Sequence, residues 1–272
     1  MTVAMGFQCS DGVLLCADTE LSYGTSGKSQ ECKIHILSGG GKGPACACVY
    51  AGDVDFMKKV LPSLEQAADA EETKIAHRLE REWQTIHRKS RTRFRKGEEF
   101  PWIQMLFAIG GKRGPRLYYA NGDIFRLEKR CEFIGIGRDV ARSWVAPFYP
   151  ATKPPALQEA SFFVIAGLKT AMQFVQGCGG EAQTLLFGVF SGVLEPLEVS
   201  NSKELEERFL YLQAKIGPLV ASFSEVTSPR FDRALKRFAG NLKTYQKLKY
   251  REEARRQRWR EREEEKMRRE NE

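Results

Sequence analysis

The chain alternates between strand-forming and helix-forming stretches, and this alternation constrains its fold more than any other feature. Four strand-like stretches are followed by two helical ones, three strands, two more helical stretches and a last pair of strands. In chain order they are 1–8, 13–17, 32–37, 45–52, 53–68, 73–86, 102–111, 115–120, 131–137, 137–149, 156–177, 183–192 and 193–199. Two mostly antiparallel sheets covered by two helical layers would bury all the apolar faces. We therefore expect an α+β fold, a four-layer αββα sandwich.

The strongest local signal is a β-hairpin at the start of the chain. Residues 1–8 and 13–17 flank Asp11 and Gly12, a dipeptide that strongly favours a tight hairpin turn. The Gly- and Ser-rich stretch at 22–29 is expected to be a loop. The hairpin brings the end of the second strand back toward the first residues of the chain.

The helical stretches carry weaker boundary signals. Pro62 predicts an interruption of the helix at 53–68, and Thr73 is a suitable N-cap for the helix that follows. The stretch 156–177 is apolar enough to be buried on most sides.

Three regions are expected along the chain. Residues 1–200 should form the compact body, and 201–250 a helical extension that docks on another subunit. An apolar seam runs along its last helix, at Phe231, Leu235, Phe238, Leu242 and Tyr245. Residues 251–272 mix both charges and predict a solvated helix or tail.

The charge and the cysteines limit the classes of function. Lys and Arg number 43 against 35 Asp and Glu, which raises nucleic-acid binding as an alternative. Interleaved Glu in the tail cancels much of the attraction to phosphate, so this alternative ranks below an enzyme. Seven cysteines without CxxC pairs, no signal peptide and no membrane-length apolar run favour a reducing cytoplasm. With only three histidines, we expect no His-based metal site or catalytic triad. We also expect no cofactor.

Thr2 is the residue with the most specific chemistry. A threonine hydroxyl needs a base, and the α-amine of the same residue, with a pKa of about 7.7–8.0, could serve once Met1 is removed. A lysine would lower the pKa of the hydroxyl, and a carboxylate would hold the lysine. Lys33 and Asp18 are the candidates, although alternation places Asp18 on the face of Val3. Taken singly, each residue also has an ordinary interpretation: Thr2 as an edge residue of a strand, Asp18 as a carboxylate at a strand end, and Lys33 as a surface lysine.

Together these residues carry a resemblance over roughly residues 2–200. The segments TVAMGFQCSDGVLLCADTELSYG, KIHIL and VYAGDVDF resemble proteasome β-type subunits, which are N-terminal-nucleophile (Ntn) hydrolases and threonine peptidases. The resemblance is to bacterial proteasome-like proteins that lack a propeptide. It implies Thr2 as nucleophile, its α-amine as base, Asp18 and Lys33 as the supporting pair, and the Gly52 N–H as oxyanion donor. It also implies the αββα Ntn fold.

The same resemblance implies partners. Such subunits are self-compartmentalising endopeptidases that assemble into a ring or helical homo-oligomer and admit peptides or unfolded proteins. A regulatory ATPase is a further implied partner.

Three positions depart from the family pattern. Ile136 stands where a serine supports the amine, Val175 stands at a carboxylate position, and Cys178 replaces a second serine. The chain is then either a divergent but working threonine peptidase or a catalytically silent ring subunit. The presence of Thr2 together with its supporting pair favours the working enzyme.

Overall fold

The computed structural model describes residues 2–22, 27–38, 45–69, 74–93, 102–111, 114–146, 149, 153–190 and 193–198. The expected docking extension at 201–250, the charged tail at 251–272 and the suggested N-cap Thr73 lie outside the described residues. Within them, no helix combines the length and apolarity needed to span a membrane.

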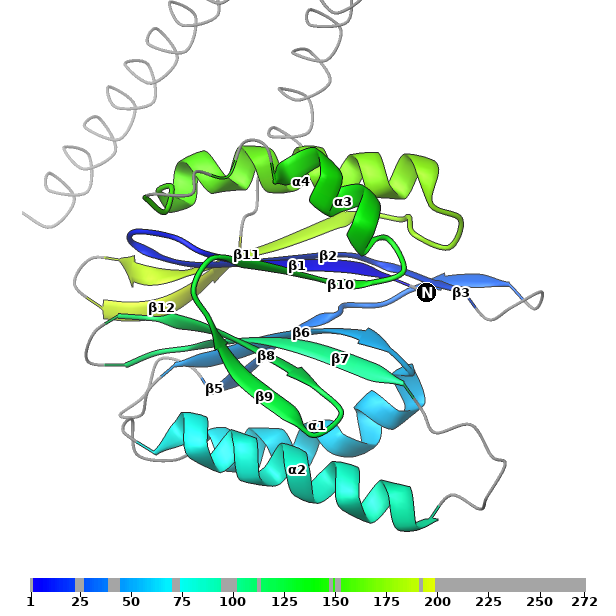
Figure 1. The fold of residues 1–272 in the computed structure, drawn as a ribbon, viewed down its shortest axis with the longest axis vertical. Coiled ribbons are helices and arrows are strands. Elements are labelled where there is room, and N and C mark those ends of the chain that lie inside the picture. Colours follow the sequence, from blue (N-terminus) through cyan, green and yellow to red (C-terminus); the bar gives the residue numbers. More distant parts are fainter. Residues whose placement is uncertain are drawn as a thin grey trace, which may run out of the picture. The chain divides into compact units, whose positions relative to one another are not determined.

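Two five-stranded antiparallel sheets stack between two pairs of helices, as Figure 1 shows. The first sheet has the order β10-β1-β2-β11-β12, with bounds Cys131–Gly135, Val3–Gln8, Gly12–Asp18, Ala182–Phe190 and Val193–Glu198. The second has the order β5-β6-β7-β8-β9, with bounds Ile34–Ser38, Cys46–Gly52, Ile103–Ile109, Arg116–Asn121 and Ile124–Glu128. Helices α3 (Arg138–Val145) and α4 (Leu157–Phe174) cover the first sheet, and α1 (Val54–Ala68) and α2 (Ile75–Arg93) cover the second. The predicted α+β, αββα architecture is confirmed.

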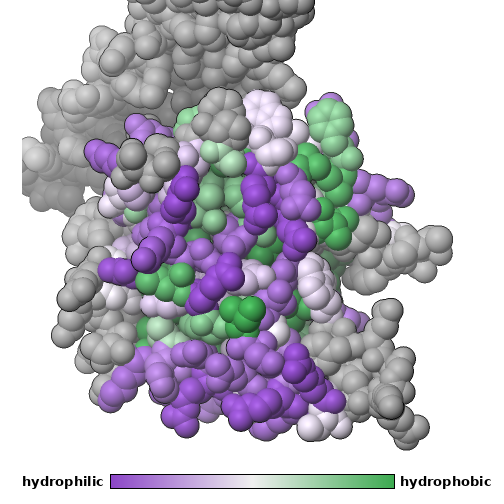
Figure 2. All heavy atoms as spheres, viewed as in Figure 1, coloured by the Kyte–Doolittle hydropathy of each residue, from purple (hydrophilic) through white to green (hydrophobic). Residues whose placement is uncertain are grey.

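Three apolar clusters hold the four layers together. Alternating side chains of β1 and β2 face either α3 and α4 or the second sheet, because successive strand residues point to opposite faces. Met5 and Leu14 belong to the cluster under α4, whereas Ala4 and Leu15 belong to the cluster between the sheets. Trp83 of α2 belongs to the third cluster. The outer surface of α2 is polar, as Figure 2 shows. Five of its basic residues are exposed, as expected for a solvated helix face: Arg78, Arg81, Arg88, Lys89 and Arg91.

The predicted hairpin fixes where the start of the chain lies. β1 and β2 pair antiparallel with Ala4 opposite Ala17, which places Asp18 opposite Val3 at the open end. At the turn, the Asp11 carboxylate accepts a hydrogen bond from the backbone N–H of Leu157, the first residue of α4 (2.8 Å). The turn of the hairpin is therefore hydrogen-bonded to the helical layer, and the open end places Asp18 beside Val3 at the start of the chain.

Two local predictions were wrong, and one strand was missed. The expected loop at 22–29 contains part of a short hairpin, β3 (Glu20–Ser22) with β4 (Lys28–Gln30). β9 was not predicted. Helix α1 continues through Pro62 without the expected interruption, because Pro62 is exposed and water can satisfy the carbonyl that its missing N–H leaves free.

Candidate active site

Thr2 lies immediately before β1, where the ends of several strands meet. It is 3% exposed. Its carbonyl oxygen accepts a hydrogen bond from the backbone N–H of Gly137 (3.4 Å). Gly135 has a φ of +86°, and a Cβ there would collide with the same oxygen. The turn after β10 thus needs glycine to let the chain start pass this closely.

Asp18, the last residue of β2, is fully buried and accepts three hydrogen bonds. Its Oδ1 accepts from the backbone N–H of Val3 (3.0 Å) and from Lys33 Nζ (2.9 Å). Its Oδ2 accepts from the backbone N–H of Gly179 (3.0 Å). The expectation that Asp18 shares the face of Val3 is met, and the carboxylate reaches the start of the chain through the Val3 N–H, one peptide from Thr2.

Lys33 precedes β5 and is also fully buried, with side-chain exposure of 0%. Its Nζ donates to Asp18 Oδ1 (2.9 Å) and to the carbonyl oxygen of Glu20 (2.6 Å). Its backbone N–H donates to Gln183 Oε1 (2.9 Å). The reading of Lys33 as a surface lysine is therefore wrong, and the predicted contact between Lys33 and Asp18 is present.

Burial perturbs both members of this ion pair. The pKa of Lys33 is lowered because its ammonium loses water, and the attraction of Asp18 opposes that shift. The pKa of Asp18 is raised for the same reason, and Lys33 with the two backbone N–H groups opposes the shift. The charge on each group therefore depends on the other.

Gly52, the predicted oxyanion donor, ends β6 beside the start of β7. Its φ is +131°, and a Cβ there would collide with the Trp102 carbonyl and lie 2.8 Å from the Ile103 Cα. The preceding residue, Ala51, has its Cβ 3.2 Å from the point where a Cβ on Gly135 would lie. The end of β6 thus packs on the turn that holds the Thr2 carbonyl. The oxyanion role of Gly52 stays a prediction.

The three departures lie around the same end of the sheets. Ile136 is 45% exposed in the turn between Gly135 and Gly137. Val175 is the C-cap that follows α4, and its carbonyl accepts a hydrogen bond from the backbone N–H of Cys178 (3.1 Å). Cys178 is buried, and burial raises the pKa of its thiol to about 12. A thiol with that pKa stays neutral at pH 7 and supplies no charge.

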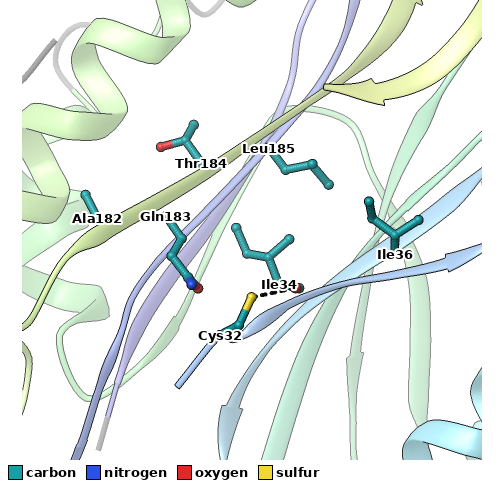
Figure 3. Close-up of a pocket in the computed structure, with 7 residues that line it drawn as sticks. All are labelled: Cys32, Ile34, Ile36, Ala182, Gln183, Thr184 and Leu185. Atoms are coloured by element: carbon teal, nitrogen blue, oxygen red, sulfur yellow. Dashed lines mark hydrogen bonds between the residues drawn. The ribbon is translucent and has the colours of Figure 1, made fainter. Parts of the chain in front are cut away.

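Sequence reasoning missed two residues that hold Lys33: Glu20 through its carbonyl oxygen and Gln183 through its side chain. Gln183 lies 150 positions from Lys33, so no local pattern could reveal the contact. Figure 3 shows its side chain reaching from β11 toward the segment from Cys32 to Ile34, across a pocket of about 150 Å³. The backbone of Lys33 is thus held from β11 and its amine from β2 and β3.

The fold and this arrangement define a protein of the proteasome-like Ntn type. A family model described as Proteasome subunit matches residues 2–181, about two thirds of the sequence. The chain belongs to the proteasome subunit family. No curated protein sequence matches it.

Solved structures with the same fold share little sequence with the chain. Anbu (ancestral beta-subunit) from Yersinia bercovieri is 12% identical with a TM-score of 0.67, covering 81% of this chain and 97% of that chain. The helical assembly of the Anbu complex from Pseudomonas aeruginosa gives 10% identity, a TM-score of 0.67, and coverage of 81% and 96%. Anbu from Hyphomicrobium sp. strain MC1 gives 12% identity, a TM-score of 0.63, and coverage of 81% and 97%. At these identities the likeness is one of fold.

Proposed function

We propose that the chain is a threonine-type endopeptidase subunit that cleaves peptides or unfolded proteins, with Thr2 as nucleophile after removal of Met1. The observation that carries this proposal is the buried ion pair of Asp18 and Lys33, bonded to the Val3 N–H directly after Thr2. Membership of the proteasome subunit family supports the same assignment.

In this proposal the α-amine of Thr2 takes the hydroxyl proton as Thr2 Oγ bonds to the carbonyl carbon of the peptide. The Gly52 N–H donates to the developing oxyanion. The C–N bond then breaks, the proton passes to the leaving amine, and an ester remains on Thr2. Water hydrolyses the ester, which restores the hydroxyl and releases a carboxylic acid. Lys33 stabilises the deprotonated oxygen by its charge, and Asp18 holds Lys33. No step uses a metal or cofactor.

Intact-protein mass spectrometry with a β-lactone, an electrophile for N-terminal threonine, tests this proposal. We expect the mass to lack one methionine and to increase by one adduct, mapped to Thr2 and absent in Thr2→Ala. The Thr2→Ser variant is the matched control, because it keeps a hydroxyl and an α-amine and should still be labelled. Retained Met1 with no adduct would refute the proposal, since a blocked amine cannot act as the base.

A second candidate is a catalytically silent subunit. It is favoured by Ile136, Val175 and Cys178, which leave the expected hydroxyl and carboxylate groups out of the site. In that case the protein lacking Met1 would still resist the β-lactone over a range of pH, while keeping its assembly.

Assembly is the other part of the proposal. The Pseudomonas aeruginosa structure is a helical assembly, and we infer that this chain forms a ring or helical homo-oligomer, with a regulatory ATPase as a further partner. The region 201–250 is expected to contribute to the contacts between subunits. Sedimentation velocity of the full chain and of a truncation after Ser228 tests this, and unchanged sedimentation on truncation would rule out that role for the seam.

A further inference from the structure

Glu20 contacts Lys33, Gly179 and Lys28, and no part of the proposed mechanism uses it. Its backbone N–H donates to the carbonyl of Gly179 (3.0 Å), and its own carbonyl accepts from Lys33 Nζ (2.6 Å). Its carboxylate pairs with Lys28 Nζ at 3.0 Å. The residue is buried although it carries a charge.

Gly179 connects the carboxylate of Asp18 to the backbone of Glu20. Its N–H donates to Asp18 Oδ2, and its carbonyl accepts from the Glu20 N–H. A Cβ on Gly179 would lie 2.5 Å from Glu20 Oε2, so glycine permits this close approach. A shift of Glu20 would therefore disturb the hydrogen bonds of Asp18 as well as those of Lys33.

Lys28 holds Glu20 from the outer strand of a small hairpin. Glu20 pairs with Gln30 and Ser22 with Lys28 across β3 and β4, and the side chain of Lys28 crosses back to the carboxylate. The side chain of Lys28 is 67% exposed, whereas that of Glu20 is 11% exposed. The ion pair thus links β3 to β4, and β3 is the strand whose Glu20 carbonyl binds Lys33.

The proposed chemistry requires Lys33 to be protonated, and burial works against that. The charged or titratable groups that bear on its ammonium are Asp18 from β2, Glu20 from β3 and Cys178 from the turn before β11. Asp18 is shared with two backbone N–H groups, and the Cys178 thiol stays neutral. Glu20 is then the second negative charge that favours the ammonium form, with a smaller effect on the pKa of Lys33 than Asp18.

We propose that Glu20 is a positioning residue for Lys33, acting through its carbonyl and its carboxylate. The ion pair with Lys28 fixes the carbonyl against Lys33 Nζ, and the carboxylate helps keep Lys33 protonated at neutral pH. The importance of this for catalysis rests on the proposed function, whereas its effect on Lys33 does not.

Titration of Lys33 tests the charge. The full chain is labelled with lysine carrying ¹³C at Cε, the Lys33 signal is assigned with Lys33→Arg, and its pKa is measured in wild type and in Glu20→Gln. We expect the variant to lower the pKa of Lys33, because it removes a negative charge that favours the ammonium. An unchanged pKa in a folded Glu20→Gln variant would overturn the proposal, because a structural role does not require the charge.

Labelling of Thr2 by the β-lactone across pH supplies the second measurement. In Glu20→Gln the alkaline limb of the rate profile should move to lower pH along with the pKa of Lys33, whereas a merely structural defect lowers the rate without moving the limb. Lys28→Gln should slow labelling without lowering that pKa, and Lys28→Arg should restore the rate. Equal slowing by Lys28→Arg and Lys28→Gln would contradict the role of the ion pair.

A distant ion pair provides the control for both measurements. Arg91→Gln breaks a distant exposed pair with Asp123 and should change neither the Lys33 pKa nor the labelling rate. If wild type is not labelled at all, the proposed function fails. The Lys33 titration then still decides whether Glu20 acts on Lys33.

Discussion

The change Asp18→Asn should destabilise the protein strongly, although it alters one atom. The carboxylate accepts from Lys33 Nζ and from the backbone N–H groups of Val3 and Gly179, and both partners of the ion pair are inaccessible to water. An Asn amide offers one oxygen and places an NH₂ group opposite donors. It also leaves the buried ammonium of Lys33 without the carboxylate that it pairs with.

The expected loss is about 3–5 kcal/mol, the range found when one partner of a buried pair is removed. Domains are stable by only about 5–15 kcal/mol, so this is a large fraction of the total. Lys33→Met should cost a similar amount. The double variant Asp18→Asn with Lys33→Met should cost clearly less than the sum, because no uncompensated charge remains.

Urea unfolding at pH 7, followed by far-UV circular dichroism, measures all three variants. Arg91→Gln at the exposed pair with Asp123 is the control and should change the unfolding free energy by about 1 kcal/mol or less. A loss below about 1 kcal/mol for Asp18→Asn, or strictly additive losses in the double variant, would refute the reasoning that the two charges depend on each other.

Three further outcomes are expected. Gly135→Ala should destabilise the fold by several kcal/mol, because its Cβ would collide with the Thr2 carbonyl. Gly122 also has a positive φ (+57°) but lies in open space, so Gly122→Ala should cost only about 1–2 kcal/mol. Urea unfolding measures both variants, and equal losses would contradict the role of the collision. Iodoacetamide at pH 8 should alkylate Cys32 first, because it is the exposed cysteine and the others are buried or partly buried. Peptide mass mapping identifies the alkylated residue, and earlier reaction at another cysteine would contradict the burial of that residue. Burial lowers the pKa of His87 below its ordinary 6.5. Between the folded and unfolded pKa values the unfolded chain binds more protons, so the free energy of unfolding should fall as pH drops through 6.5. A fall of the same size in His87→Gln would show that His87 does not contribute to this pH dependence.

The sequence was informative where chemistry and backbone geometry are local. Asp11-Gly12 predicted the first hairpin, and that hairpin brings Asp18 back to the chain start. The two missed strand regions differ in kind. Asn121-Gly122 is a strong hairpin signal that could have predicted β9, whereas β3 and β4 are three residues each, and β4 is wholly exposed, so no apolar alternation marks it.

The supporting contacts of the site could not be predicted, because they are long-range and partly made by backbone atoms. The carbonyl of Glu20 holds Lys33 Nζ, and any residue type has a carbonyl. The side chain of Gln183 holds the Lys33 backbone, but glutamine has no preference that would reveal it. Only the fold brings β3, β5 and β11 together at this point.

The two sets of features at the site differ in what they say about activity. The glycine at 135 is required by packing, since a Cβ there would strike the Thr2 carbonyl, so its presence is explained by the fold alone. The ion pair of Asp18 and Lys33 is not explained in this way. Burying two charges costs solvation that their attraction roughly repays, and an apolar pair of similar volume would serve stability as well or better. A silent subunit has no physical need for the pair. Its presence one peptide from Thr2 is therefore a stronger argument for chemistry than the losses represented by Ile136 and Val175 are against it.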